Sequence, residues 1–387
     1  MSAPLVSLPA PSVSPAEYAE ALSTFLRTDP RAEPYLGYRP DSFEDAASYL
    51  TGLQYLLCEE GWARLGWPER FGGLGGDPRL RAAMFECLWA ADIVIPEPYS
   101  LLEVLVPVLM IYAPELAQEH FLPLLRGDEN WCEGFSEPDA GSDLASLRTR
   151  MEPDGDGWRV TGQKIWTSNG HLSRRSVLLA RSGEPGHRGL SMVLIDLDQP
   201  GVEVRPIRTE SGEQHFSEMF FDGAWLPGDR VIGRLGQGWA IAMYMLQWER
   251  GAYGWLQQGR LHNRLGLALR CADEGAGERA GVARALGSAY ASAAALRLRT
   301  RNTVERLARD ETLGPEVAID KLLLVDAEVA SWDVIRELFG TAFDVDPALE
   351  WLRAEFLFSR AAPIYGGSQE IQRTLVAERV LGMPRTR

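Results

Sequence analysis

The sequence contains few of the residues that build metal sites and disulfide frameworks. Among 387 residues there are four cysteines and five histidines. Cys58, Cys87, Cys132 and Cys271 lie far apart without a CxxC pair, and no histidines form an HExxH pattern. This excludes the common zinc motifs and indicates a reducing compartment, because secreted domains concentrate paired cysteines. We therefore predict a cytoplasmic protein without a metal.

Long apolar runs and an excess of positive charge are also lacking. The longest uncharged apolar stretch, residues 104–113, has ten residues and includes Pro107, about half the length of a membrane span. The N-terminal residues have neither the cationic start nor the apolar core of a signal peptide. Asp and Glu number 54 against 39 Lys and Arg, a net charge of −15. Because nucleic acids and anionic membranes attract cationic faces, neither is expected as a partner.

The distribution of apolar residues divides the chain into three parts. Its length predicts two or three domains. After a proline-rich arm of fifteen residues, apolar side chains recur three and four positions apart up to about residue 128, which predicts helices. Short runs of β-forming residues separated by turns follow, and helical periodicity then returns. We predict an α+β multidomain protein with an N-terminal helical domain (1–129), a central antiparallel β domain (130–235) and a C-terminal helical bundle (236–387).

Glu249 is the most informative single residue. On the predicted helix that begins at Gly238, the positions three, four and seven before it are Leu246, Met245 and Ala242. An acid within an apolar stripe should lose hydration, which raises its pKa and suits it to act as a general base. The other interpretation is an ion pair with Arg250 or with a neighbouring helix.

Three further segments carry candidate ligand-binding groups. Residues 131–143 combine small and hydroxyl side chains around two turns, which offer donors to a flavin or a phosphate. Residues 162–170 place Trp166 and Ser168 where an aromatic ligand could stack, and Ser368 is a natural N-cap that exposes amides to an anion. The plainer interpretations are a loop, a hairpin whose Trp fills the core, and a helix cap without a ligand.

Taken together, these segments resemble the acyl-CoA dehydrogenase family over nearly the whole chain. GFSEPDAGSD is similar to the family signature with its T-E-P-x-A-G-S-D core, and KIWTSNG to K-x-W-I-T-N-G. FSEMFFDGAWLPGDRVIG resembles the end of the family's β domain, and YGGSQEIQRTLVAERVLGMPR its C-terminal Y-E-G-T-x-x-I-Q signature. The resemblance implies the family's helical–β–helical fold, FAD, and oxidation of a thioester at its α and β carbons.

The resemblance also implies roles for residues. The cofactor positions of the family fall on Phe135, Ser136, Ser142, Trp166, Ser168, Gly367, Ser368 and Glu370. The substrate positions fall on Ser142, Arg250 and Tyr365, and the catalytic positions on Glu249 and Gly366, whose amide is expected to bind the thioester oxygen.

Two departures from the family pattern set this chain apart. The usual base is the Glu of Y-E-G-T, which is Gly366 here. The isovaleryl- and long-chain types instead place a Glu before an Arg on the first C-terminal helix, and Glu249-Arg250 matches that pair. The R-x-x-F-G segment, whose Arg reaches the FAD of a neighbouring subunit, is absent from residues 261–281, and Q-x-x-G-G is degraded to residues 336–340. These losses resemble a divergent bacterial subfamily acting on steroid side chains or specialised metabolites, some members of which are heteromers.

The leading hypothesis is FAD-dependent α,β-dehydrogenation of an acyl-CoA or acyl-carrier-protein thioester. An electron-transfer flavoprotein or similar acceptor would take the electrons, and a homodimer or homotetramer is expected, with a heteromer as a further possibility. One alternative is a flavin monooxygenase or oxidase of the same fold acting on a small amine, nitro or aromatic compound. The other is a partner subunit that completes the FAD site of a second chain.

Overall fold

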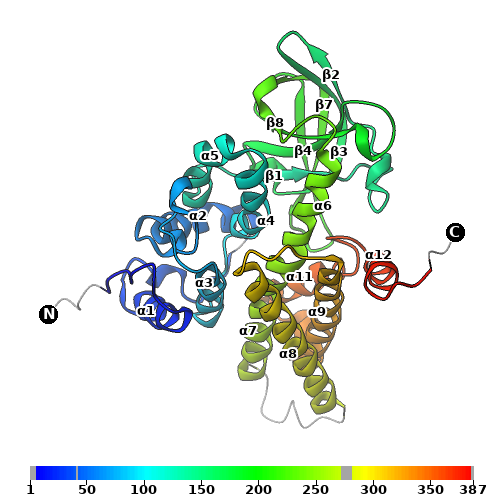
Figure 1. Cartoon of the computed structure of the whole chain (residues 1–387). Helices are drawn as coiled ribbons and strands as arrows, with labels where there is room; N and C mark the ends of the chain where they lie inside the picture. The colour runs from blue at the N-terminus through cyan, green and yellow to red at the C-terminus, as the bar shows by residue number, and fades with distance from the viewer. Residues whose placement is uncertain (1–5, 41, 272–280, 385–387) are drawn as a thin grey trace.

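The computed structural model describes residues 6–40, 42–271 and 281–384, and it confirms the predicted fold class (Figure 1). The first part of the chain is helical. Ser14 and Glu17 form a capping box, in which the Ser14 Oγ accepts from the Glu17 amide at 3.3 Å, and Pro15 opens the first helix. The helices of this part are α1 (Pro15–Thr28), α2 (Phe43–Glu59), α3 (Arg79–Ala90), α4 (Glu97–Tyr112) and α5 (Pro114–Arg126).

An eight-stranded sheet follows, at the top of Figure 1. Its spatial order is β6-β7-β3-β2-β4-β5-β8, and β1 pairs with β4. The strands are β1 (Trp131–Gly134), β2 (Arg150–Asp154), β3 (Gly157–Ser168), β4 (Arg175–Arg181), β5 (Leu190–Asp196), β6 (Val202–Ile207), β7 (Phe216–Pro227) and β8 (Val231–Ile232).

The central β domain is mostly antiparallel, as predicted, and it also contains parallel pairings. β1 runs parallel to β4 along its whole length, and β2 and β4 share a parallel pairing at Arg150 and Arg181. A parallel pair needs a long connection, and the hairpin of β2 and β3 supplies one between β1 and β4. The sheet is therefore mixed, although most of its pairs are antiparallel.

The C-terminal part is helical again, and its first element differs from the prediction. The helix predicted to begin at Gly238 does not continue without interruption. The structure contains α6 (Gly238–Trp248), a π-helical segment (Glu249–Tyr253) and then α7 (Gly254–Cys271). The helices that follow are α8 (Val282–Leu307), α9 (Ala318–Phe339), α10 (Thr341–Val345), α11 (Glu350–Ser359) and α12 (Gln369–Leu375), with a second π-helical segment at Val376–Val380.

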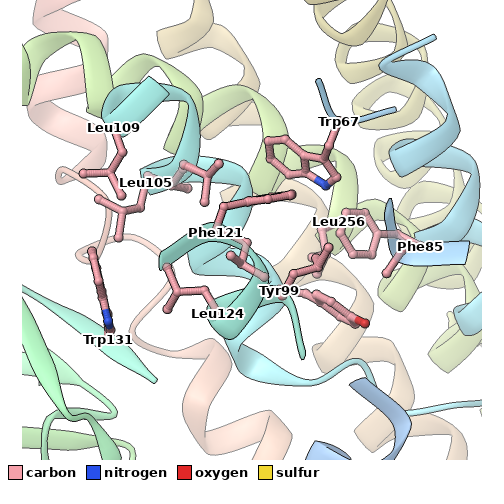
Figure 2. Packing of buried hydrophobic residues seen from close by; sticks show 14 of the residues in the cluster. Trp67, Phe85, Tyr99, Leu105, Leu109, Phe121, Leu124, Trp131 and Leu256 are labelled. Atoms are coloured by element: carbon pink, nitrogen blue, oxygen red, sulfur yellow. The ribbon is translucent and has the colours of Figure 1, made fainter. Parts of the chain in front are cut away.

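One apolar cluster joins the three parts of the molecule. Figure 2 shows side chains of the N-terminal helices packed with Trp131 of β1 and Leu256 of α7. The same cluster includes buried residues of β4, β5 and α6. Burying apolar area in a shared cluster is the main driving force that holds these elements together, so β1 and α6 are fixed against the same helices. Within the described residues, no helix is both long and apolar enough to span a bilayer.

The domain ranges 1–129, 130–235 and 236–387 stay a prediction. Residues 272–280, where much of the altered R-x-x-F-G region falls, lie outside the described residues.

Candidate active site

Glu249 lies where the helical path changes. The buried residues Ile241, Ala242 and Met245 of α6 anchor the preceding turns to the core, and Glu249 is the first residue of the π-helical segment. Gly251 lets this segment approach α8, because a Cβ there would lie 2.7 Å from Thr303 Cγ2. Single π-helical turns widen the helix locally and redirect side chains, and they are frequent at functional sites.

Burial and nearby charges act on the Glu249 carboxyl in opposite directions. Burial raises the pKa of its carboxyl, while the positive charges of Arg250 and Lys321 oppose that rise. Burial also lowers the pKa of Arg250, and its Nε has no hydrogen-bond partner among the described residues. The plainer interpretation of a simple ion pair does not describe this site, since no contact between Glu249 and a cation within 4.0 Å is seen in the described chain.

The Gly366-Gly367 turn faces the Glu249 carboxylate. Both glycines have left-handed φ values, +63° and +87°. A Cβ on Gly366 would lie 3.0 Å from Glu249 Oε1, and one on Gly367 would lie 2.4 Å from Gln372 Nε2. Only glycine meets both the conformation and the space without strain. The turn ends at Ser368, whose Oγ accepts from the Ile371 amide and caps α12.

A second acid, Glu133, was missed at the level of the sequence. It lies on β1, and burial together with the charge of Glu249 raises its pKa well above the ordinary value. Two neighbouring acids in a water-poor site resist ionising together. Of the two pKa values, that of Glu133 is raised further. The sequence feature that could have indicated Glu133 is a single acid among the apolar or small residues of W-C-E-G-F.

Two predicted segments meet around Lys164 of β3. Its ammonium donates to the Phe135 carbonyl at 2.9 Å and to Glu137 Oε1 at 2.8 Å. The Ile165 amide donates to the Ser136 carbonyl at 3.0 Å. Burial lowers the pKa of Lys164 to about 8, although the Glu137 carboxylate opposes this. The loop of residues 135–137 is thereby tied to the strand that carries Trp166.

The Trp166 side chain is exposed to solvent and does not fill the core. It lies at an irregularity in the β3–β7 pairing, with a φ of +62°, and 58% of it is exposed. A positive φ is unusual for a bulky residue, and such strain clusters at ligand sites. The adjacent Thr167 hydroxyl is buried without a partner among the described residues. The interpretation of a core tryptophan was therefore wrong, because the bulge reverses the alternation of the strand.

An aromatic row connects Trp166 to the Gly366 turn. Trp166 meets Phe216 of β7 edge to face at 6.0 Å, and Phe216 stacks on Phe358 of α11 at 6.1 Å. Phe358 then contacts Tyr365 at 5.9 Å. The sequence motifs did not identify Phe216 or Phe358, since their roles depend on which strand and helix become neighbours.

The remaining predicted residues lie around this centre. Phe135, Ser136, Gly367 and Ser368 are half-buried, and Tyr365 donates its hydroxyl hydrogen bond to Glu328 at 3.0 Å. The exposed side chains of Ser142, Ser168 and Glu370 form no side-chain hydrogen bond with the described residues, so they are open to a ligand.

Comparison with known proteins defines the class. The acyl-CoA dehydrogenase middle-domain model matches residues 132–224, and the acyl-CoA dehydrogenase C-terminal-domain model matches residues 236–381. Together with a curated relative at 40% identity, these matches show that the chain belongs to the acyl-CoA dehydrogenase family. It is an oxidoreductase of that family, whose reaction is the dehydrogenation of acyl thioesters.

The relatives give a finer picture. The chain is 40% identical over 366 residues to the acyl-CoA dehydrogenase IpdE1 of Mycobacterium tuberculosis, covering 90% of this chain and 91% of the relative. The structure of the Tcur3481-Tcur3483 steroid ACAD superimposes with a TM-score of 0.83 at 26% identity, over 96% of this chain and 98% of the other. The ChsE4-ChsE5 complex of M. tuberculosis, at 23% identity, shares the fold with a TM-score of 0.79 over 97% of this chain and 99% of the other.

Proposed function

We propose that this protein catalyses the FAD-dependent α,β-dehydrogenation of an acyl-CoA or acyl-carrier-protein thioester to the 2-enoyl thioester, with Glu249 as the base. One observation carries the proposal. A half-buried carboxylate with a raised pKa faces a glycine turn at the position where most family members carry their own catalytic Glu. The two possible base positions therefore flank one space.

The residues around Trp166 fit FAD. The exposed indole offers a flat apolar surface for an aromatic ring, and the buried Thr167 hydroxyl finds no hydrogen-bond partner in the part of the chain that the structure describes. The free hydroxyls of Ser142 and Ser168 and the helix cap at Ser368 offer donors to the polar parts of the cofactor. When bound, FAD supplies the acceptor for the hydride that leaves the β carbon.

The chain's own residues account for the other half of the reaction. The α-hydrogen of a thioester is a weak acid, so its removal needs both a strong base and stabilisation of the oxygen on which negative charge develops. Burial makes the Glu249 carboxylate more basic, and it takes the α-proton. The Gly366 amide donates to the thioester oxygen, while Arg250 supplies positive charge beside the base. Gly366 has no side chain, which leaves the room that Glu249 requires.

The names of the relatives suggest which substrates and which oligomeric state should be tested. A structural neighbour is named the Tcur3481-Tcur3483 steroid ACAD. A thioester with a bulky ring system should therefore be tested as a substrate, and the protein should also be tested together with a partner chain. The missing R-x-x-F-G segment also favours a heteromer in which a second chain completes the FAD contacts. We propose an electron-transfer flavoprotein as the acceptor and the cytoplasm as the location. A monooxygenase or oxidase would not need a base beside Gly366, and this disfavours that alternative.

The test is anaerobic flavin reduction by a panel of acyl thioesters, including straight-chain, branched and ring-bearing acyl groups. Glu249→Gln should keep FAD but lose about three or more orders of magnitude in the reduction rate, the scale expected for removing a positioned base. Glu203→Gln on the exposed strand β6 is the matched control and should leave the rate unchanged. Reduction of the Glu249→Gln flavin at near wild-type speed would show that Glu249 is not the base.

Moving the base tests the geometry. In the Glu249→Gln background, Gly366→Glu should restore part of the rate, because both positions flank the same space. The recovery should be incomplete, since a side chain at the Gly366 φ of +63° costs roughly 1–2 kcal/mol. No gain over Glu249→Gln, in a variant that still binds FAD, would contradict the shared position of the two bases.

A further inference from the structure

Lys321 is a buried cation with no assigned role. It lies on α9 in the run A-I-D-K-L-L-L and is 3% exposed. Its Nζ makes no hydrogen bond with the described residues. An ammonium has three donors, and burying it without partners is costly. A lysine in such a place needs a compensating interaction that a side-chain hydrogen bond does not provide.

The compensating groups lie on two sides of the ammonium. The Lys321 Nζ lies 3.8 Å from the centre of the Tyr365 ring, in cation–π contact. It is also 3.7 Å from the position of a Cβ on Gly366, and Glu249 Oε1 is 3.0 Å from that same point. The ammonium and the carboxylate are therefore at most about 7 Å apart, a separation at which charges shielded from water still interact strongly.

We propose that Lys321 is a positioning residue for Glu249: its ammonium, seated on the Tyr365 ring, keeps the carboxylate ionised without occupying it. The inference rests on the proposed role of Glu249 as the base. A direct ion pair would occupy the carboxylate oxygens that must receive the proton. The contact with the Tyr365 ring keeps the Lys321 ammonium out of hydrogen-bond distance of Glu249. Its positive charge still stabilises the carboxylate, whose oxygens remain free to accept the proton.

Charges on every neighbouring element act on this pair. Arg250, on the π-helical segment, also favours the ionised form of Glu249. Glu133 on β1 also faces Glu249, whose charge raises the pKa of Glu133. Glu328 on α9 faces Lys321, but it is already paired with Arg260 of α7 at 2.6 Å and accepts from Tyr365. Burial lowers the pKa of Lys321 to about 8, while Glu249 and Glu328 raise it and Arg250 lowers it. Lys321 is therefore mainly protonated at neutral pH.

The sign of the pH effect follows from these charges. Burial raises the pKa of Glu249, and Arg250 and Lys321 lower it. Without the Lys321 ammonium only Arg250 counteracts burial, so the pKa of Glu249 should rise. Lys321→Met should move the acidic limb of the flavin-reduction profile to higher pH by about one unit or more. Lys321→Arg keeps the positive charge and should hold the limb close to that of the wild type. Tyr365→Leu frees the ammonium to approach the carboxylate, which should move the limb to lower pH and reduce the plateau rate.

A purely structural lysine would behave differently. It would change the rate or the stability equally at all pH values and leave the limb in place. An unmoved limb in Lys321→Met would therefore overturn the proposal, as would a limb in Lys321→Arg that moves as far as in Lys321→Met. If Lys321→Met does not fold, Tyr365→Leu still decides, because an upward or absent shift there contradicts the geometry.

A direct titration separates this inference from the proposed function. In protein carrying ¹³C-labelled glutamate, infrared difference spectra against pH should contain a protonated-carboxyl band that is absent from Glu249→Gln. The midpoint of this band should be higher in Lys321→Met than in the wild type. If no acyl thioester reduces the flavin, the proposed function fails, yet the band still reports the effect of Lys321 on Glu249. An unchanged midpoint in active protein overturns the inference alone.

Discussion

At the scale of single residues, the site contains side chains placed against their ordinary preference. Trp166 is exposed with a left-handed backbone, Lys321 is buried, and Glu249 and Glu133 are half-buried acids whose pKa values are raised. Exposing an aromatic ring loses apolar burial, and burying charges loses hydration. Residues in such unfavourable environments cluster at functional sites, where they contact a ligand or take part in a reaction. These four residues therefore define the centre of the site.

Trp166→Ala should weaken FAD binding by about tenfold. The expected loss reflects the stacking surface that the indole offers, since an aromatic contact contributes roughly 1 kcal/mol beyond its buried area. Titration of flavin-free protein with FAD, followed by fluorescence, measures the affinity. Tyr55→Ala, at an exposed aromatic residue on α2, is the control and should bind FAD like the wild type. Equal affinities in both variants would argue against stacking on Trp166.

Glu133→Gln tests which of the two buried acids holds the proton. Burial and the Glu249 charge raise the pKa of Glu133 well above the ordinary range, so we expect Glu133 to be neutral when Glu249 ionises. Glutamine imitates that neutral form, and the acidic limb of the pH–rate profile should stay in place. If Glu133 were ionised instead, its removal would take away a repelling charge and move the limb to lower pH. The position of the limb distinguishes these outcomes.

At the scale of elements, the buried pair of Glu137 and Lys164 joins the loop after β1 to β3. Glu137 also accepts from the amides of Arg148 and Thr149, at 2.6 and 2.9 Å. Burial would raise the pKa of Glu137, but Lys164 and these hydrogen bonds together lower it. One carboxylate thus orders the loop that carries Ser136 and the strand that carries Trp166.

Lys164→Met should lower the free energy of unfolding by about 3–5 kcal/mol, because it leaves a buried charge unpaired. Chemical denaturation measures this, and the exposed pair of Arg159 and Asp154 provides the control. Arg159→Ala should cost no more than about 1 kcal/mol. A cost for Lys164→Met as small as that of the control would contradict the structural role of the pair.

The same pair predicts a pH dependence with a definite sign. Since the folded-state pKa of Glu137 is below its ordinary value of about 4.3, its contribution to stability is complete above that pH. The contribution is lost as the pH falls through the lowered pKa. In Lys164→Met this part of the acid sensitivity should shrink, which denaturation curves at several acidic pH values would detect.

At the scale of the whole molecule, three large apolar side chains near the C-terminal end of the chain are exposed. Ile364, Leu381 and Met383 are 70%, 68% and 55% exposed, and α12 stands at the side of the helical bundle (Figure 1). Large apolar side chains that water surrounds are candidates for contact with another chain. With a net charge of −15, such chains repel one another, so salt should favour their association.

We therefore expect a dimer or a dimer of dimers in solution, or a heteromer when a partner chain is present. The double variant Leu381→Glu, Met383→Glu should lower the mass measured by light scattering and leave the circular-dichroism spectrum unchanged. Leu298→Glu, at a residue of α8 that is 70% exposed, is the control and should keep the mass. A wild-type protein that is monomeric at micromolar concentration with FAD bound would contradict the expectation.

Features that depend on neighbouring residues could be predicted from the sequence, whereas features that depend on contacts between distant segments could not. Helices such as α1 and the cap at Ser368 were predictable, because their signals lie within a few residues of one another. The π-helical segment at Glu249 was not, since it depends on the close packing of Gly251 against α8. The strand alone left it open whether Trp166 fills the core or faces a ligand, because that depends on a bulge formed with β7.

The amino-acid sequence by itself determined the order of helical, β and helical parts, the family, and Glu249 as the acid in an apolar stripe. Periodicity and local motifs encode these features, so no partner element is needed to read them. Only the tertiary structure decided that Glu133, Lys321 and Tyr365 surround that acid. These residues lie on β1, on α9 and before α12, and charges act through space, so their effect on Glu249 exists only once the three elements pack together.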